Sequence, residues 1–490
     1  MTHANTTDDA ARPAPARTED AANGADAASS DAATRRRIMA LAVPTFGQLI
    51  AEPTFILIDT AIVGHLGDAA LAGLSIGSTI ILTAVGLCVF LAYATTARVA
   101  HLLGAGRRRE GMQTGIDGMW LALGIGLILA AALFLGAEPL CRALGGRGEV
   151  LTQAVAYTRA VVLGAPGMLL VYAANGIFRG LQKVRVTLIA AVAGAALNTV
   201  LDVLFVIVFR WGIAGSGVAT LMAQWFMGLF LAVPAVLWAR ADGASLRPRP
   251  AGLLRVGGDG LPLFIRTLAI RVAMVATVAC AARMGTGVLA GFQAVNSTWN
   301  FATNMLDSVG IAGQTLVGSA LGARAYDRAR GDARTTGRMG LAIGAAAGLG
   351  FAAVGLFAGR FFSPSPEIQT LVAAGMITMG VFFPLQGWMM ALDGILIGAR
   401  DHRYLAATCT AVAAAYVVAL AAAGAWAASW QTGPSGILAG FGVFGRSDGM
   451  AVDIVRTVLV WTVFNVVLMG GRALANGLRA HGDAWMHRHA

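Results

Sequence analysis

Charged side chains are scarce in this sequence. Asp, Glu, Lys and Arg together make up only 12% of the 490 residues, about half the share of a typical soluble domain. Apolar residues make up 57%, and the mean hydropathy is +0.70. These values exclude a soluble globular enzyme, a disordered protein and a secreted disulfide scaffold. They leave a membrane protein whose helices take up most of the chain.

Lysine and cysteine are also rare. Lys183 is the only lysine, and its neighbours do not form the GxxxxGK[ST] loop that cradles nucleotide phosphates, so an ATPase of that type is excluded. The four cysteines have neither CxxC nor metal-ligand spacing. HExxH, Ser–His and thiol constellations are missing, as is a DDxxD pair within the apolar spans. We therefore expect no enzyme, no metal and no cofactor.

Apolar spans of about 20 residues, the length that crosses a bilayer, recur twelve times. The segment 1–37 is rich in Ala, Asp and Thr and is expected to form a disordered cytoplasmic tail. The Gly-rich segment 429–451 is expected to be an external loop. The predicted spans are 38–62, 70–97, 114–136, 152–177, 186–209, 213–238, 259–282, 289–320, 337–358, 367–397, 404–428 and 452–475.

Basic residues predict the orientation. The two termini and alternate loops carry 24 Lys and Arg residues, against six on the opposite side. This bias places both termini in the cytoplasm of a protein in the inner (plasma) membrane. The net charge of +11 is explained by these clusters, so we expect no nucleic-acid partner.

An internal repeat appears when the chain is shifted by 218 residues. Pro44 then aligns with Pro262, and Pro166 with Pro384, without a gap over about 140 residues. Because six spans separate the copies, both start on the same side. The repeat predicts an all-α membrane protein with two parallel six-helix lobes, related by a pseudo-twofold axis along the membrane normal. The predicted units are the lobes 38–238 and 258–480, a cytoplasmic linker at 239–257 and a cytoplasmic tail at 481–490.

Carboxylates inside apolar spans are costly and mark function by default. Asp59 lies deep in the first span, and Glu52 lies seven residues earlier on nearly the same face. Pro53 is expected to kink this span and give it a hinge. Asp59 could instead only hydrogen-bond a neighbouring helix, and Glu52 could lie near the cytoplasmic mouth.

The fifth span carries Asn198 and Asp202, four residues apart and therefore on one face of a helix. An amide and a carboxylate in this arrangement can share a proton or coordinate a small cation, and Thr220 in the sixth span could add a hydroxyl. The alternative is that the pair merely joins two helices by hydrogen bonds.

The second lobe has its own polar candidates. Asp393 aligns with Asn175 in the repeat, which suggests either a shared architectural role or a shared place in a substrate cavity. Asp307 is expected to form a structural ion pair with Arg266 or Arg271. Aromatic and methionine side chains that could line a drug cavity, or simply pack, are Phe292, Trp299 and Met305.

Several motifs together resemble the MATE family of multidrug and toxic-compound exporters, in its DinF branch. They are EP followed by DTAIVGHLG at 52–67, FRGLQ at 178–182, LFIRTLAIR at 263–271 and LDGILIGA at 392–399. The resemblance covers roughly 38–428. It implies a V-shaped antiporter with one central cavity, expected to act as a monomer on small-molecule substrates within membrane lipid. Gln48 is assigned to the substrate cavity.

The resemblance also implies the coupling site. The acidic cluster of the family matches Asp59, Asn198, Asp202 and Thr220, and a tyrosine of the family matches Tyr157. The branch is thought to favour protons, although sodium remains possible at Asp59, Asn198 and Asp202. We therefore expect a proton-coupled exporter of lipophilic, cationic small molecules. The alternatives are sodium coupling and a flippase or exporter for lipid-linked or polysaccharide precursors, which would have a more basic cavity.

Overall fold

The computed structural model describes residues 17–357, 359–429 and 449–486. Helices form all of the regular structure in this part of the chain. The N-terminal lobe contains α1 (Arg17–Gly64), α2 (Asp68–Leu87), α3 (Phe90–Gly104), α4 (Arg108–Leu135), α5 (Ala137–Ala143), α6 (Gly148–Val162), α7 (Ala165–Gly180), α8 (Val184–Asp202), the π-helical turn η1 (Val203–Val208) and α9 (Gly212–Ala241).

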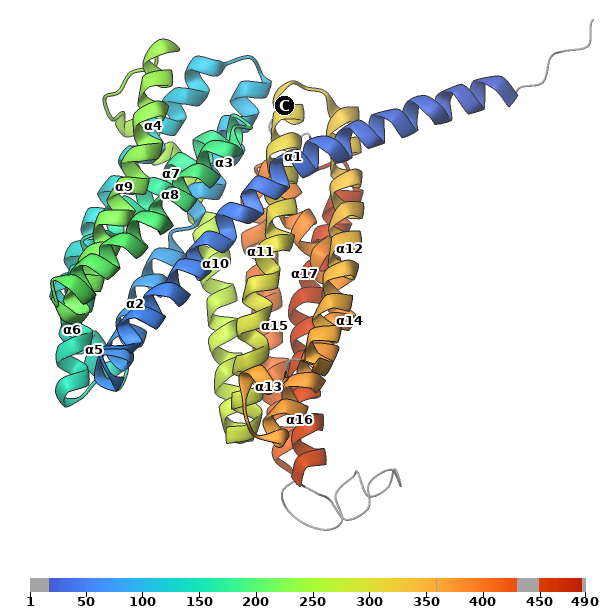
Figure 1. Ribbon diagram of the computed structural model, residues 1–490. Coiled ribbons are helices and arrows are strands. Elements are labelled where there is room, and N and C mark those ends of the chain that lie inside the picture. The colour runs from blue at the N-terminus through green and yellow to red at the C-terminus, as the bar shows by residue number, and fades with distance from the viewer. Residues whose placement is uncertain (1–16, 358, 430–448, 487–490) are drawn as a thin grey trace, which may run out of the picture.

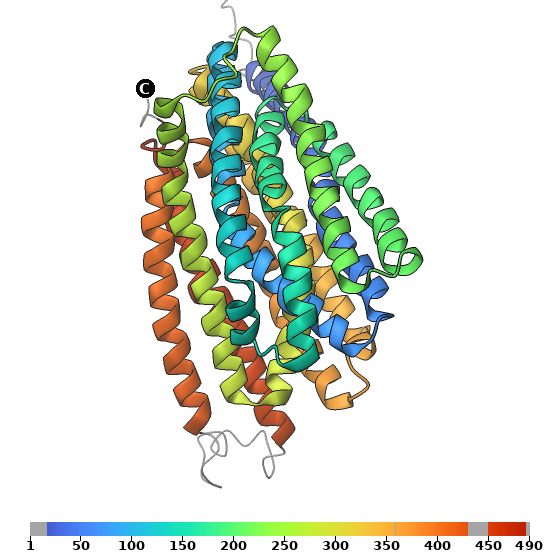
Figure 2. The ribbon, with the colours of Figure 1, turned by 90° about the vertical axis from the view of Figure 1, so that its left-hand side faces the viewer.

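The C-terminal lobe repeats this order. It contains α10 (Pro250–Met284), α11 (Thr286–Gly322), α12 (Tyr326–Phe357), α13 (Gly359–Phe362), α14 (Pro366–Gly398), α15 (His402–Ser429), α16 (Gly449–Val463), η3 (Phe464–Met469) and α17 (Gly470–His481). In Figure 1 the two lobes converge at the upper end and separate toward the lower end, and Figure 2 shows the helices running side by side.

The twelve predicted membrane crossings are confirmed. Within the described residues, ten helical stretches are long and apolar enough to span a bilayer, and the bent pair α6–α7 adds an eleventh. The twelfth is α11, a more polar helix of 37 residues, which is longer than a bilayer crossing requires. Many large apolar side chains, such as Ile128 and Leu349, are exposed on the outer faces, as expected for contact with lipid.

The repeat is visible in the backbone. Three pairs of turn residues with positive φ lie 218 positions apart: Gly67 with Gly285, Gly106 with Arg324, and Gln182 with Arg400. The left-handed conformation is uncommon for a residue with a side chain, yet Gln182 and Arg400 both adopt it at φ 60°. Equivalent helix ends thus share one turn geometry, and the two lobes have the same chain path.

The lobes meet most closely where α3 crosses α11. A Cβ on Gly104 would overlap the carbonyl oxygen of Ser319, and a Cβ on Gly322 would overlap that of His101. These residues are again 218 apart, so the pseudo-twofold axis passes between the two glycines. This crossing lies at the upper end in Figure 1, where α1 begins and α17 ends. The salt bridge from Arg98 to Asp259, at 2.5 Å, joins α3 to α10.

Three expectations need correction. Helix α1 already begins at Arg17, so residues 17–37 are helical, because an Ala-rich stretch that continues a helix has high helical propensity. Helix α1 is continuous through Pro53, and the kink expected there stays a prediction. The linker shrinks to eight residues between Ala241 and Pro250, since α9 and α10 extend beyond the apolar spans.

The last correction concerns the C-terminal segment. Trp485 and Met486 are buried against the end of the bundle rather than forming part of a free tail. The expected external loop at 429–451 lies almost entirely outside the described residues, which resume with α16 at Gly449.

Candidate coupling site and cavity

Besides Asp117, which pairs with Arg249, two carboxylates are buried inside the N-terminal lobe. Asp59 is on α1 and Asp202 is the last residue of α8, and their exposed fractions are 3% and 0%. Neither lies within salt-bridge distance of a basic side chain in the described part of the chain. A buried carboxylate without a cationic partner is expensive, so this pair is poised to take up a proton or a cation.

Ser216 on α9 connects this pair to a third helix. Its fully buried hydroxyl donates a hydrogen bond of 2.5 Å to Asp59 Oδ1. Asp202 Oδ1 is buried and has no hydrogen-bond partner. Because buried polar atoms normally have partners, this oxygen marks the point at which a proton or cation would complete the site.

The other predicted residues surround the pair. Asn198 Nδ2 lies 3.3 Å from Thr220 Oγ1, and with the amide turned over the nitrogen would donate to Asp202 Oδ2 at 2.8 Å. Tyr157 is buried, and its hydroxyl accepts a hydrogen bond of 3.4 Å from Ser78. The structure thus brings together all five residues that the resemblance assigned to coupling.

Helical spacing explains this assembly. Asn198 and Asp202 are four residues apart on α8, and Ser216 and Thr220 are four apart on α9, so each pair shares a helix face. The π-helical turn η1 begins directly after Asp202, and such turns often occur at functional sites. The sequence analysis missed Ser216, although its position one turn before Thr220 was a usable signal.

A cavity of about 90 Å³ lies between α1, α2, α7, α8 and α9, next to Asn198. This is room for a few water molecules rather than for a drug-sized ligand. Glu52 is the only lining residue with a formal charge at neutral pH, and Asn198 links the cavity to the carboxylates. The other polar lining residues are Gln48, Tyr172, Asn175 and Gln224.

Gln48 of this cavity accepts a hydrogen bond of 2.9 Å from Arg179, which joins α1 to α7 within the N-terminal lobe. Asp307 on α11 accepts a hydrogen bond of 3.1 Å from the Tyr93 hydroxyl on α3. The expected ion pair of Asp307 with Arg266 or Arg271 is therefore wrong, because a tyrosine of the other lobe holds this carboxylate.

Asp393 has a different environment. It is hydrogen-bonded and ion-paired to both Arg266 and Arg472, and it accepts a hydrogen bond of 2.6 Å from Asn476. This carboxylate is compensated twice over, and it does not line the cavity of the N-terminal lobe. Its repeat mate Asn175 does line that cavity, so the two residues do not share one cavity, and a shared architectural role stays a prediction.

The expected aromatic and methionine lining is not found at this cavity either. Trp299 is buried in the core of the C-terminal lobe, where its indole nitrogen donates to Gln386 Oε1 at 2.8 Å. Met305 is only partly buried and lies on α11. Phe292 stacks on Trp461 at 4.7 Å between ring centroids. Phe292 and Trp299 therefore pack the core of the second lobe.

Comparison with known proteins agrees with this architecture. The MatE family model matches residues 44–204 and 262–423, two stretches that begin 218 residues apart. Protein DETOXIFICATION 43 from Arabidopsis thaliana is 28% identical over 449 residues, covering 79% of this chain and 84% of the relative. DNA damage-inducible protein F from Escherichia coli is 28% identical over 397 residues, covering 78% and 84%.

A solved structure extends the likeness to the fold. The Vibrio cholerae MATE transporter VcmN in its bent form aligns with a TM-score of 0.79 at 18% identity, covering 94% of this chain and 99% of that one. The two family matches together cover well over half of the sequence. The chain belongs to the MatE family of multidrug and toxic-compound extrusion transporters.

Proposed function

We propose that this transporter exports lipophilic, cationic small molecules in exchange for protons by alternating access. Asp59 and Asp202 form the coupling pair, and Ser216, Asn198, Thr220 and Tyr157 complete their surroundings. In this proposal the chain acts as a monomer in the plasma membrane, with both termini in the cytoplasm. No group in the mechanism has to come from a second copy.

The observation that carries the proposal is the contrast between the pair Asp59–Asp202 and Asp393. Asp59 and Asp202 are buried without a basic partner, whereas Asp393 holds two arginines. A carboxylate that is already compensated gains little from a proton. An uncompensated pair changes the charge of its cavity by binding one, so coupling belongs to the N-terminal lobe.

The proposed cycle is a competition for this negative site. Protons that enter from the open end neutralise the pair, which removes its attraction for a cation and releases the bound drug. Loss of the protons to the other side restores the negative charge. Each ligand shifts the two states of the lobes only through its different affinity for them. The lobes are closed at the α3–α11 crossing, which lies at the end that carries the termini. Because the proposal places the termini in the cytoplasm, the closed end faces the cytoplasm and the conformation is outward-open.

Sodium is a second candidate for the coupling ion, because the cluster offers oxygen atoms from two carboxylates, an amide and hydroxyls. A precursor exporter is less favoured, since no Arg or Lys lines the described cavity. A lining in which Glu52 is the only charged group suits a cation.

The direct test is proton release from the purified full-length protein in weakly buffered detergent solution. Adding a lipophilic cation should release protons from the wild type and not from Asp59→Asn. Adding NaCl in place of the cation, with choline chloride as the control, separates the two ions. Release by sodium would assign a sodium site, and no release by either ligand would contradict the antiport proposal.

A further inference from the structure

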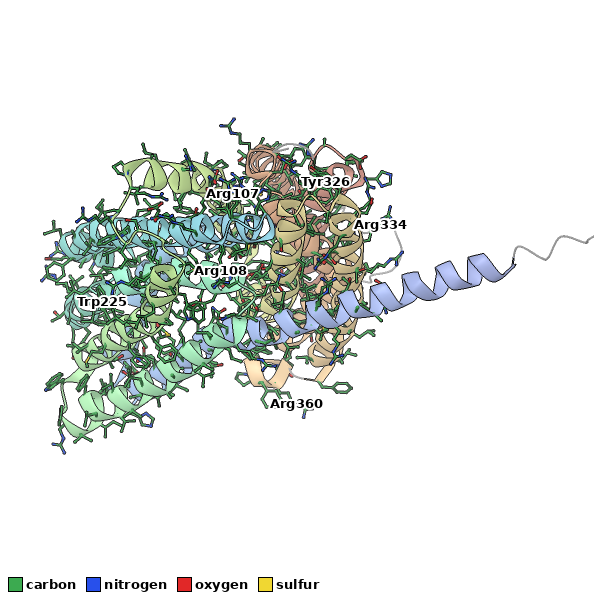
Figure 3. The ribbon with its side chains drawn as sticks, turned by 90° about the horizontal axis from the view of Figure 1, so that it is seen from above. Arg107, Arg108, Trp225, Tyr326, Arg334 and Arg360 are labelled. Carbon is green, nitrogen blue, oxygen red and sulfur yellow. The ribbon has the colours of Figure 1, made fainter. Side chains whose placement is uncertain are left out.

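A groove lies between α12, α14 and α17, at the end of the molecule that carries the described termini. It has a volume of about 320 Å³. Arg330, Arg334 and Arg338 line it, and their spacing of four residues places all three on one face of α12. Figure 3, which looks down on this end, shows Arg334 at the outer edge of the C-terminal lobe.

Two of these arginines are available to a ligand. Arg330 pairs with Asp483 at 2.5 Å. Arg334 and Arg338 are exposed, and no carboxylate of the described residues lies within salt-bridge distance of either. Asp31 on α1 interacts electrostatically with Arg338 but forms its salt bridge with Arg35, and Asp332 on α12 pairs with Arg37. Arg334 and Arg338 therefore have no salt-bridge partner of their own among the described residues.

Apart from His481, the remaining wall is apolar. Leu341 continues the arginine row along α12 and is 48% exposed. Trp388 and Ile395 face the groove from α14, and Trp388 is wedged so tightly that a Cβ on Gly477 of α17 would touch its ring at 2.7 Å. Tryptophan is enriched at the level of lipid head groups. Positive charge at one end and apolar surface at the other match the two parts of a phospholipid.

We propose that this groove binds an anionic phospholipid from the leaflet on the terminus side. Its phosphate lies between Arg334 and Arg338, and an acyl chain runs along Leu341 and Trp388. Guanidinium groups bind phosphate through paired hydrogen bonds, and basic pockets between helix ends are suited to anionic head groups.

The test is lipid retention by the full-length protein, measured by native mass spectrometry after titration with phosphatidylglycerol or phosphatidylcholine. The wild type should prefer phosphatidylglycerol. The variant Arg334→Gln/Arg338→Gln should bind it about thirtyfold more weakly, because each surface arginine contributes about fivefold. Arg334→Lys/Arg338→Lys keeps the charge but loses the paired geometry, and should fall between the two.

The matched control is Arg240→Gln/Arg247→Gln, two exposed arginines at the same end with no ion pair among the described residues. Equal weakening in this control would overturn the proposal, because net charge alone would then explain the binding. Unchanged retention in Arg334→Gln/Arg338→Gln would also overturn it. Inorganic phosphate at the same concentration should not displace the lipid, and complete displacement would assign a soluble anion instead. Thermal unfolding in phosphatidylcholine confirms that every variant is folded.

Discussion

Ser216 donates a hydrogen bond of 2.5 Å to Asp59, and this bond ties α9 to α1 inside the N-terminal lobe. A hydroxyl donor stabilises the ionised form of a carboxylate. When Asp59 takes up a proton, the hydroxyl loses this acceptor and must turn or become the acceptor itself. The hydrogen bond of Ser216 therefore changes with the protonation of Asp59, and so does the contact between α1 and α9.

Ser216→Ala should shift the pH dependence of transport. Without this hydrogen-bond donor, the ionised form of Asp59 becomes less stable relative to the protonated form. Since a hydrogen bond to a charged group contributes about 1.5 kcal/mol or more, the pH of half-maximal transport should rise by about one unit. The measurement is the initial rate of drug uptake into proteoliposomes between pH 5.5 and 9.

A matched control is Ser75→Ala, because Ser75 is exposed and its hydroxyl bonds only the carbonyl oxygen of Leu71 on its own helix. Its pH profile should coincide with that of the wild type. A Ser216→Ala profile that keeps its midpoint while the maximal rate falls would show that Ser216 only supports the fold.

Removing a carboxylate should have opposite effects on stability in the two lobes. Asp202→Asn removes a buried charge that has no basic partner, so the melting temperature should stay the same or rise. Asp393→Asn strands Arg266 and Arg472, and breaking a buried pair in this way costs about 3–5 kcal/mol. Thermal unfolding of both variants in one detergent checks the prediction.

A double variant shows whether the stability loss in Asp393→Asn comes from the stranded charges or from altered packing. Adding Arg472→Gln to Asp393→Asn removes one stranded cation, so the double variant should be more stable than the sum of the two single losses predicts. If instead Asp202→Asn unfolds as early as Asp393→Asn, Asp202 is a structural residue and not part of an uncompensated pair.

The glycines at the lobe crossing give a third prediction. Gly104→Ala and Gly322→Ala each place a methyl group against a carbonyl oxygen of the other lobe, so both should destabilise the closed seam by a similar amount, about 1–3 kcal/mol. Gly331→Ala is the control, because a Cβ there meets no atom within 4 Å. Melting temperatures of the three variants, together with trypsin cleavage rates at the terminus-bearing end, measure the effect. Unequal losses at the two glycines would contradict the symmetry of the crossing.

The sequence predicts the architecture well because the relevant signals are local. Span length follows from runs of apolar residues, and the offset between Pro44 and Pro262 reveals the two lobes. The pair Asn198–Asp202 follows from helical spacing, and its meeting with Asp59 was implied by the family resemblance. The span lengths, the two lobes and the Asn198–Asp202 pair thus depend on residues close together in the chain or on a repeat that is detectable in the sequence.

Pairing between distant helices could not be predicted in this way. The partner of Asp393 on α17, Arg472, lies 79 residues later, and Asp307 bonds Tyr93 of the other lobe. Spacing along one helix carries no information about either contact. Helix α1 extends to Arg17 because alanine favours helix even in a polar stretch, which composition alone interprets as disorder.

The most direct test of the central claim is uptake of a fluorescent lipophilic cation into proteoliposomes under an imposed proton or sodium gradient. We compare the wild type with Asp59→Asn, in which the carboxylate is replaced by an amide of nearly the same size. The account predicts uptake driven by the proton gradient in the wild type and none in the variant. Equal proton-driven uptake by a folded Asp59→Asn protein would contradict it.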